Sequence, residues 1–303
     1  MKLVVTGGAG FIGSHIAKYL VKNGHDVVVV DNLYRGNIEN LKEVKNEIDF
    51  LKIDICNPEK MRDVVRNADG VLHQAALTSV QESFNNKEEY QRVNVGGTEN
   101  IFKLAKEYGL KVVYASSSSV YGNPVTVPIL ESFERKPINP YGLTKLEDEY
   151  LAEKYAKSGT QIIGLRYFNV YGKGQTNDYA GVITNFIENI TNHKPPVIYG
   201  DGTQVRDFIF VEDVAEANLA AMKSSVDHAF INIGTGVATS ISELADMLLR
   251  LSGLSLKPTY DKPREGDVKA SQADTELAKK LLSWQAKTSL EDGLRKIFPK
   301  IEK

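Results

Sequence analysis

The sequence predicts an α/β protein with a doubly wound parallel sheet and a smaller, interleaved C-terminal α/β domain. Three observations support this. The first half alternates short β-rich runs with helical patterns, a glycine-rich stretch separates the first strand from the first helix, and the elements become shorter after Tyr167. Alternating strands and helices form parallel sheets through right-handed crossovers, so helices should cover both faces of this sheet.

Six runs rich in Val, Ile and Leu are typical of parallel strands that are buried on both faces. They span 2–6, 26–31, 49–54, 70–74, 111–116 and 161–167. Helical patterns fill the longer intervals, at 13–23, 91–108 and 141–157. Gly24 and Gly109 follow two of these helices at the place of a left-handed C-terminal cap.

Beyond Tyr167, glycine, proline, asparagine and tyrosine become frequent. We expect helices at 181–189 and 213–222, strands at 197–199 and 207–211, and a capping box of Ser240 and Glu243 that starts a helix ending near Arg250. The larger domain should comprise 1–166 with a return segment at about 205–234, and the smaller one 167–204 and 235–303.

Composition excludes several classes of protein. The 303 residues are 42% hydrophobic with a formal charge of -2, which gives no electrostatic reason to expect nucleic acid or an anionic membrane as a partner. No stretch approaches the roughly 18 apolar residues of a membrane helix, and no signal peptide is apparent. The single cysteine, Cys56, excludes an intrachain disulfide and a cysteine metal cage. We expect a cytoplasmic protein without a metal.

The glycine-rich stretch fits a dinucleotide-binding turn. Residues 8–13 match G-x-G-x-x-G, and Gly7, Gly10 and Gly13 match the wider G-x-x-G-x-x-G spacing. Glycines let the backbone approach a pyrophosphate closely, and the helix that starts near Phe11 would direct free N–H groups at it. An ordinary structural turn is the alternative.

Asp31 supports the dinucleotide interpretation, because it ends the second strand 18 positions after Gly13. An acid there accepts hydrogen bonds from the adenosine ribose and repels a 2′-phosphate, so NAD is favoured over NADP in a Rossmann domain. Arg35, slightly downstream, leaves the preference between the two cofactors open.

Tyr141 and Lys145 lie four residues apart on one predicted helix, so their side chains project from the same face. A free phenol is a poor base at neutral pH, but an adjacent ammonium and an oxidised nicotinamide ring favour the phenolate. Alternatively, Tyr141 starts a helix and Lys145 is a surface charge. Tyr141 and Lys145 indicate a catalytic site only when a third motif accompanies them.

Four consecutive serines, 116–119, provide that motif at the carboxyl end of the fifth strand. Open α/β sheets bind ligands at this edge, and a serine there could hydrogen-bond a substrate hydroxyl. A polar turn is the alternative. The order of glycine turn, serine run and Tyr/Lys pair favours a catalytic site.

The chain resembles the extended short-chain dehydrogenase/reductase family, and within it the UDP-glucose 4-epimerase group. The resemblance spans nearly the whole length and rests on these ordered blocks: TGGAGFIGSH, VVVVDNLYRGN, VLHQAALTSV, NVGGTEN, VVYASSSSVYGN, NPYGLTK, LRYFNVYGKGQ, VIYGDGTQVRDFIFVEDVA, INIGTG and PREGDVKASQAD.

The resemblance assigns roles to three sets of residues. The catalytic set is Ser117, Tyr141 and Lys145. The residues matching NAD-binding positions are Gly7, Gly10, Phe11, Ile12, Gly13, Asp31, Asn32, Asp54, Ile55, Ala75, Ala76, Asn94, Tyr141, Lys145 and Tyr167. Those matching positions around the nucleotide-sugar are Ser117, Asn169, Val182, Tyr199, Arg206, Arg264, Asp267 and Ser271. Arginine suits this set because its planar fork binds phosphate oxygens in pairs.

The implied reaction is the 4-epimerisation of a UDP-hexose through transient hydride transfer to NAD and a 4-keto sugar, with NAD returned unchanged. Related dehydratases carry an Asp-Glu pair, and a decarboxylase a glutamate, where this chain has Ser118 and Ser119. Ser271 occupies a size-gating position, which implies acceptance of UDP-N-acetylhexosamines. UDP-glucuronate 4-epimerisation and a non-catalytic nucleotide sensor remain as alternatives.

The resemblance also implies a homodimer through a four-helix bundle of the helices at 91–108 and 141–157. Val93, Ile101, Phe102 and Ala105 could form its seam or face the sheet, which is the ordinary fate of apolar helix positions.

Overall fold

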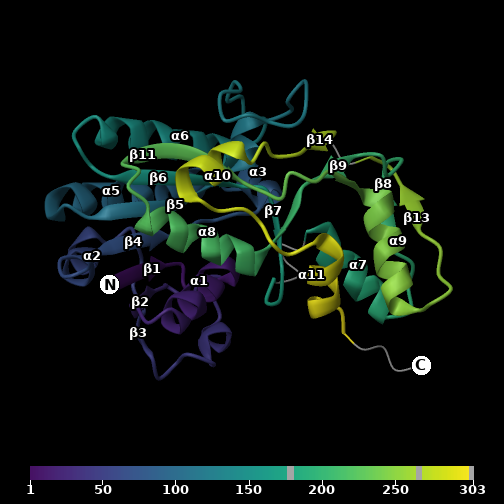
Figure 1. The fold of residues 1–303 in the computed structure, drawn as a ribbon, viewed down its shortest axis with the longest axis horizontal. Helices are drawn as coiled ribbons and strands as arrows, with labels where there is room; N and C mark the ends of the chain where they lie inside the picture. Colours follow the sequence, from purple (N-terminus) through teal and green to yellow (C-terminus); the bar gives the residue numbers. More distant parts are fainter. Residues whose placement is uncertain (176–180, 264–267, 300–303) are drawn as a thin grey trace.

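The computed structural model describes residues 1–175, 181–263 and 268–299. Figure 1 shows an elongated molecule with a larger lobe around one sheet and a smaller lobe beside it. The N-terminus lies in the larger lobe.

One seven-stranded sheet forms the larger lobe, with the order β11-β6-β5-β4-β1-β2-β3 and parallel pairing throughout. Its strands are β1 (Lys2–Thr6), β2 (Asp26–Val30), β3 (Ile48–Leu51), β4 (Gly70–His73), β5 (Lys111–Ser117), β6 (Ile162–Tyr167) and β11 (His228–Ile233). The predicted doubly wound sheet and its six strands are confirmed. The chain adds β2 and β3 on one side of β1, and β4, β5, β6 and β11 on the other side. Such sheets bind ligands at this change of strand order, between β1 and β4.

The valine runs are explained by two cores, one on each face of the sheet. Val27 and Val29 belong to the core under α1 (Phe11–Lys22) and α8 (Val211–Lys223). Val28 and Val30 belong to the core on the other face, under α2 (Pro58–Val65), α5 (Gly97–Tyr108) and α6 (Pro140–Ala156). Successive side chains of a strand point to opposite faces, so both faces must be apolar. Each fully buried valine contributes about 1.5–3 kcal/mol.

The helices of the larger lobe are α1 (Phe11–Lys22), α2 (Pro58–Val65), α3 (Val80–Asn85), α4 (Lys87–Tyr90), α5 (Gly97–Tyr108), α6 (Pro140–Ala156), α8 (Val211–Lys223) and α10 (Glu276–Leu282). Short helical turns add η1 (Ile38–Leu41), η2 (Gln91–Gly96) and η3 (Ser118–Tyr121). Gly109 ends α5 in the left-handed conformation, with φ 67°, as expected.

The predicted helix over 91–108 is two elements, because its first part, η2, is π-helical. The wider turn carries Asn94 to a buried position, where its amide binds the backbone N–H and C=O of Leu77. Such widened turns commonly occur at functional sites.

The smaller lobe packs α7 (Val182–Thr191), α9 (Ile241–Ser252) and α11 (Leu290–Ile297) around their own apolar core. Its short strands are β8 (Val197–Tyr199), β9 (Val205–Arg206), β12 (Thr239–Ser240), β13 (Thr259–Asp261) and β14 (Ala270–Ser271). The pair β7 (Asn169–Tyr171) and β10 (Phe208–Phe210) lies between the lobes and contacts α8. The predicted capping box of Ser240 and Glu243 is confirmed.

One late segment returns to the larger lobe. Helix α10 packs against β11 and α8, and Ala278, Leu282 and Trp284 join the core under α1. Part of the segment 235–303 therefore lies on the large sheet.

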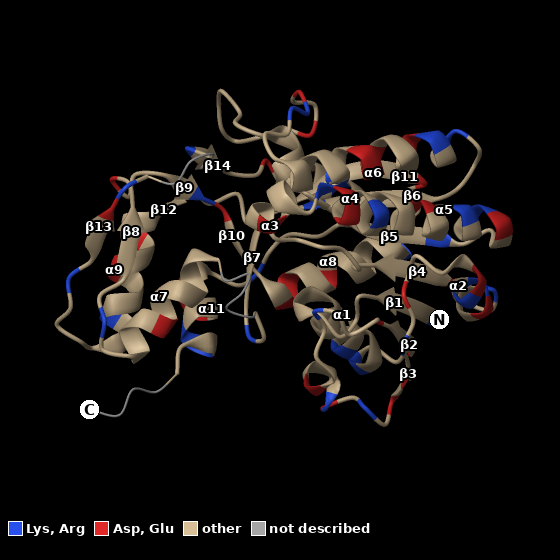
Figure 2. Ribbon diagram, turned by 180° about the vertical axis from the view of Figure 1, so that it is seen from behind, with Lys and Arg blue, Asp and Glu red and all other residues tan. Residues whose placement is uncertain are grey.

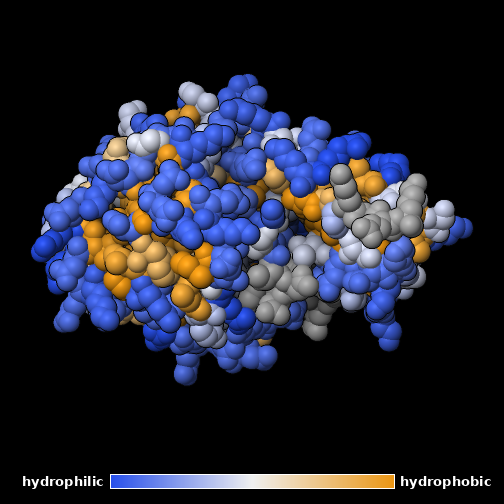
Figure 3. Space-filling model, turned by 90° about the horizontal axis from the view of Figure 1, so that it is seen from below, coloured by the Kyte–Doolittle hydropathy of each residue, from blue (hydrophilic) through white to orange (hydrophobic). Residues whose placement is uncertain are grey.

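The surface carries both signs of charge. In Figure 2, basic and acidic residues alternate over both lobes. Figure 3 shows that hydrophilic residues cover most of the lower face, with apolar ones gathered mainly on the larger lobe. In the part of the chain that the structure describes, every helix is too short or too polar to cross a bilayer.

Candidate active site

A cavity of about 800 Å³ lies at the carboxyl ends of the parallel strands, against the glycine turn after β1. It is lined by every predicted cofactor residue except Asn94, and by Ser117 of the predicted catalytic set. Asn94 is buried behind the wall, where it holds Leu77 and also donates to Oγ1 of Thr144 at 3.0 Å. In the described structure Asn94 therefore positions Leu77, which lines the cavity.

The glycine turn requires its glycines. Gly7 has φ 65°, and a Cβ added there would lie 2.7 Å from Cα of Ala75 on the neighbouring strand connection. A Cβ on Gly13 would lie 2.2 Å from the carbonyl oxygen of Gly7. Helix α1 follows with Gly10 as its N-cap and no side-chain cap, so its first N–H groups are available to an anion.

Asp31 directly follows β2, and its carboxylate can accept more hydrogen bonds than the two described next. Its carboxylate accepts one N–H from Ala9 at 3.0 Å and one from Leu33 at 2.8 Å. Burial raises the pKa of Asp31, and these backbone hydrogen bonds oppose that rise. A carboxylate has about four acceptor positions, so two ribose hydroxyls can still bind.

Asn32 and Asp54 extend the same wall. The Asn32 amide donates to Oδ2 of Asp54 at 3.3 Å, and the N–H of Cys56 donates to Oδ1 at 2.8 Å. Burial raises the pKa of Asp54, but the hydrogen bonds from Cys56 and Asn32 outweigh it, so the net pKa is lowered.

Ser117, Tyr141 and Lys145 line the cavity from two elements, β5 and α6. Oγ of Ser117 accepts hydrogen bonds from both the N–H (3.1 Å) and the hydroxyl (2.8 Å) of Ser119. Both of its lone pairs are therefore used, and its own proton remains to be donated into the cavity. Asn139 caps α6 through the N–H of Gly142, which fixes the turn that carries Tyr141.

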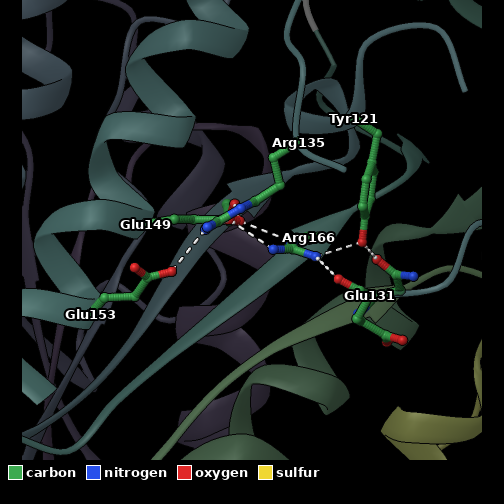
Figure 4. Close-up of polar contacts among 8 residues, drawn as sticks. Tyr121, Glu131, Arg135, Glu149, Glu153 and Arg166 are labelled. Atoms are coloured by element: carbon green, nitrogen blue, oxygen red, sulfur yellow. Dashed lines mark hydrogen bonds and ion pairs between the residues drawn. The ribbon is translucent and has the colours of Figure 1, made fainter. Parts of the chain in front are cut away.

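A buried ionic network, drawn in Figure 4, fixes α6 to the sheet. Arg166 on β6 donates to both carboxylate oxygens of Glu149 on α6, each at 2.8 Å, and Arg135 donates to the same carboxylate at 3.0 Å. Ser116, next to Ser117, also donates to Glu149 at 2.7 Å. The two elements of the catalytic set are thus joined through one carboxylate.

A second cavity of about 410 Å³ opens between the lobes. Its lining includes the predicted substrate residues Asn169, Val182, Tyr199 and Arg206. Val170 and Gln175 line both cavities, so the two adjoin.

The remaining predicted substrate residues lie elsewhere. Ser271 is buried on β14, where it pairs with Arg206 on β9, and it does not belong to the lining of either cavity. Arg264 and Asp267 lie outside the described residues.

Comparison with known proteins identifies the family. The "NAD dependent epimerase/dehydratase family" matches residues 3–234. The chain belongs to this family. The resemblance seen in the sequence is thereby confirmed, and NAD is the cofactor of the family.

Relatives within the family are similar over nearly their full length. A putative UDP-glucose 4-epimerase of Methanocaldococcus jannaschii is 39% identical over 97% of this chain and 96% of its own length. A UDP-glucuronate 4-epimerase of Thermodesulfobacterium geofontis is 36% identical over 97% and 94%. The crystal structure of a Thermotoga maritima UDP-glucose 4-epimerase with UDP-glucose superposes with a TM-score of 0.93, at 38% identity over 98% and 97%.

The residues present fit the cofactor of the family. The close approach of Gly7 and Gly13, the open N-terminus of α1 and the spare acceptors of Asp31 suit a pyrophosphate and an adenosine ribose. Bound NAD would supply a hydride acceptor beside Ser117, Tyr141 and Lys145.

The sequence patterns missed some residues that support this site. Asp148 contacts Lys145, and His73 and Thr98 lie beneath them. Their only signal was position: His73 ends a strand at the ligand-binding edge, and Asp148 follows Lys145 by three residues on the same helix.

Proposed function

We propose that the protein is a UDP-hexose 4-epimerase that interconverts UDP-glucose with UDP-galactose and UDP-N-acetylglucosamine with UDP-N-acetylgalactosamine. The observation that carries this proposal is that Ser117, Tyr141 and Lys145 line the same cavity as the glycine turn and Asp31. A base, a hydroxyl donor and a cation beside a dinucleotide site suit the reversible oxidation of an alcohol.

In this reaction Tyr141, as the phenolate, accepts the proton of the sugar's 4-hydroxyl, and Ser117 donates a hydrogen bond to the same oxygen. Lys145 stabilises the phenolate electrostatically. Bound NAD would supply a reversible hydride acceptor for C4, and inversion at C4 requires that the sugar present both of its faces to the same cofactor. The protein must therefore anchor the nucleotide while the sugar turns.

The second cavity is the proposed nucleotide anchor. Arg206 supplies a guanidinium for diphosphate oxygens, and Asn169 and Tyr199 supply polar contacts for the uridine. We assign the segments 1–166 and about 205–234 to NAD binding, and 167–204 and 235–303 to the nucleotide-sugar. Arg264 and Asp267 belong to the second assignment.

Ser271 is the proposed size gate for the sugar, since it lies beside Arg206 in the β14–β9 pair. A small side chain there leaves room for an N-acetyl group. We expect Ser271→Tyr to lower the turnover of the two N-acetylated substrates at least tenfold and to spare UDP-glucose, whereas Ser271→Ala spares both. Equal loss on both substrate pairs would exclude this gate.

UDP-glucuronate is the second candidate substrate, because the Thermodesulfobacterium relative carries that name at 36% identity. A non-catalytic nucleotide sensor is a third possibility, disfavoured by the presence of both Tyr141 and Lys145. Incubation of the purified protein with each UDP-sugar, without added cofactor, separates the three. Equilibration of UDP-glucose with UDP-galactose supports the proposal, conversion of UDP-glucuronate alone supports the second, and inertness toward all supports the sensor.

A cytoplasmic homodimer is also proposed. Ile101, Phe102 and Ala105 are buried in the core of the large sheet, so they do not form a subunit seam. Leu143 and Tyr150 are instead 48% and 51% exposed, and they share one face of α6 at a spacing of seven. Light scattering of Leu143→Asp should show a monomer if this face is the interface.

A further inference from the structure

Asp148 lies one helical turn after Lys145 on α6, beneath the proposed catalytic site. Nζ of Lys145 is 3.2 Å from Oδ2 of Asp148, and the two side chains are only 3% and 0% exposed. Removing two charges from water costs several kcal/mol each, so a pair at this depth requires good geometry and further hydrogen bonds.

Those further hydrogen bonds form a chain that reaches the glycine turn. Thr98 on α5 donates to Asp148, and Oγ1 of Thr98 lies 3.0 Å from Nε2 of His73. Nδ1 of His73 lies 2.6 Å from Oγ1 of Thr6 at the end of β1, and the N–H of Ala75 donates to the same oxygen at 3.4 Å.

The chemistry of the groups sets the direction of this chain. A carboxylate only accepts, so Thr98 donates to Asp148 and must accept from Nε2–H of His73. Nδ1 of His73 then accepts from Thr6. Burial, and secondly the charge of Lys145, lowers the pKa of His73 to about 3, which keeps the imidazole neutral. Thr6, His73 and Thr98 each have a partner in this chain, and its last acceptor is Asp148.

The surroundings of Asp148 are unfavourable for a charged carboxylate. Its second oxygen, Oδ1, is buried without a hydrogen-bond partner among the residues that the structure describes. Burial raises the pKa of the Asp148 carboxyl to about 7, and Lys145 and Thr98 oppose this rise. The charge of Asp148 therefore depends on Lys145.

Other titratable groups surround the pair on each packed element. Those that interact with Asp148 or Lys145 are Glu147 on α6, His73 on β4 and Tyr114 on β5, and Tyr114 interacts in turn with Glu149, Arg166 and Arg135. Arg166 and Arg135 are already bound to Glu149, and His73 is neutral. Asp148 is thus the carboxylate that contacts Lys145.

We propose that Asp148 is a positioning residue whose carboxylate holds the Lys145 ammonium and offsets part of the positive charge that this ammonium presents to Tyr141. The inference rests on the proposed roles of Tyr141 and Lys145. With Asp148 ionised, the positive field at the phenol is weaker, so the phenolate forms at a higher pH than it would beside Lys145 alone. Loss of the carboxylate charge shifts phenolate formation to lower pH.

The test follows the ionisation of Tyr141 directly, in the protein as purified. The ultraviolet absorbance of tyrosinate is titrated with pH, and Tyr141→Phe provides the baseline to be subtracted. We expect Asp148→Asn to lower the midpoint by about one pH unit. Thr98→Val, which removes one donor to the carboxylate, should give a smaller shift in the same direction. Glu147→Gln removes a charge from the same helix turn without touching Lys145 and should leave the midpoint within about 0.2 units.

Turnover of UDP-glucose against pH gives an independent measurement, since the acid limb of its profile should move with the tyrosinate midpoint. A purely structural role for Asp148 would lower turnover equally at every pH and leave both midpoints in place, and this result would overturn the inference. A raised midpoint would overturn it too. If Asp148→Asn does not fold, an unshifted Thr98→Val decides against it. Inertness of the wild type toward every UDP-sugar would instead refute the proposed function, while the absorbance titration still tests Asp148.

Discussion

The two adjoining cavities are built in different ways. The first is lined by the carboxyl ends of neighbouring strands of one sheet, with Gly7 and Asp31 held by backbone contacts and Lys145 by a buried ion pair. The second is lined by β7, which lies between the lobes, and by α7, β8 and β9 of the smaller lobe. The first therefore has its shape fixed by the large core, and the second by a few short strand pairs.

This difference matches what the proposed reaction requires of each cavity. A cofactor that gives back the hydride it receives must stay in one place, and rigid strand ends provide that. The sugar must turn between its two hydride transfers, so only the nucleotide part of the substrate needs to be bound tightly. Variants in the first cavity should accordingly abolish chemistry or cofactor retention, whereas variants in the second should change substrate affinity.

Tyr141→Phe should have the largest effect, because it removes the base and little else. We expect turnover to fall about 10³–10⁴-fold, equivalent to about 4–5.5 kcal/mol, with the bound dinucleotide and the melting temperature unchanged. Equilibration of UDP-galactose with UDP-glucose measures it. The matched control is Tyr260→Phe, which makes the same change at a site on β13 that is 61% exposed. Full activity of Tyr141→Phe would refute the proposed mechanism.

Arg166→Met should be the most destabilising substitution outside the cavities. It leaves Glu149, which is fully buried, without the two hydrogen bonds that join α6 to β6, and breaking a buried pair costs about 3–5 kcal/mol. Denaturant unfolding measures the loss. Arg295→Met breaks an exposed pair with Glu291 and should cost less than about 1 kcal/mol. Similar losses in both variants would show that the Glu149 network does not stabilise α6.

The same contrast explains how much of the site was predictable from sequence. The glycine turn, Asp31 and the Tyr141–Lys145 pair are local patterns whose spacing follows from the geometry of one strand or one helix. They lie together because parallel strands bring their carboxyl ends to a single edge. Local periodicity and sheet topology therefore predicted the glycine turn, Asp31 and the Tyr141–Lys145 pair, whereas Asn32, Asp54 and Tyr167 were expected only from the family resemblance.

Longer-range features were not predictable in this way. The chain of contacts from Asp148 through Thr98 to His73 depends on how α5 packs against α6 and β4, and the pairing of Ser271 with Arg206 joins segments far apart in the sequence. The π-helical turn that buries Asn94 likewise depends on its contact with Leu77. A local sequence pattern does not specify how distant elements pack against one another.

Gly13→Ala should separate cofactor retention from folding. Its Cβ would lie 2.2 Å from the carbonyl oxygen of Gly7, so the turn must move, at a cost of about 1–3 kcal/mol. We expect the purified variant to lose most of its bound NAD, measured by absorbance after denaturation, with a modestly lower melting temperature. Gly96→Ala is the control, because the nearest atom to its added Cβ is 3.9 Å away. Wild-type NAD content in Gly13→Ala would show that the close approach of the turn is dispensable for binding.

Arg206→Ala should have the smallest effect of these substitutions, and this effect should be confined to substrate affinity. Loss of a guanidinium that binds diphosphate oxygens would raise KM for UDP-glucose about tenfold, or about 1.4 kcal/mol, with kcat within twofold and NAD content unchanged. Arg250→Ala, on the exposed end of α9 in the same lobe, is the matched control and should leave KM unchanged. Initial rates across a range of substrate concentration measure both constants. A fall in kcat with constant KM would mean that Arg206 acts on the reacting sugar instead of the nucleotide. The assignment of catalysis to the first cavity and of nucleotide binding to the second would then be wrong.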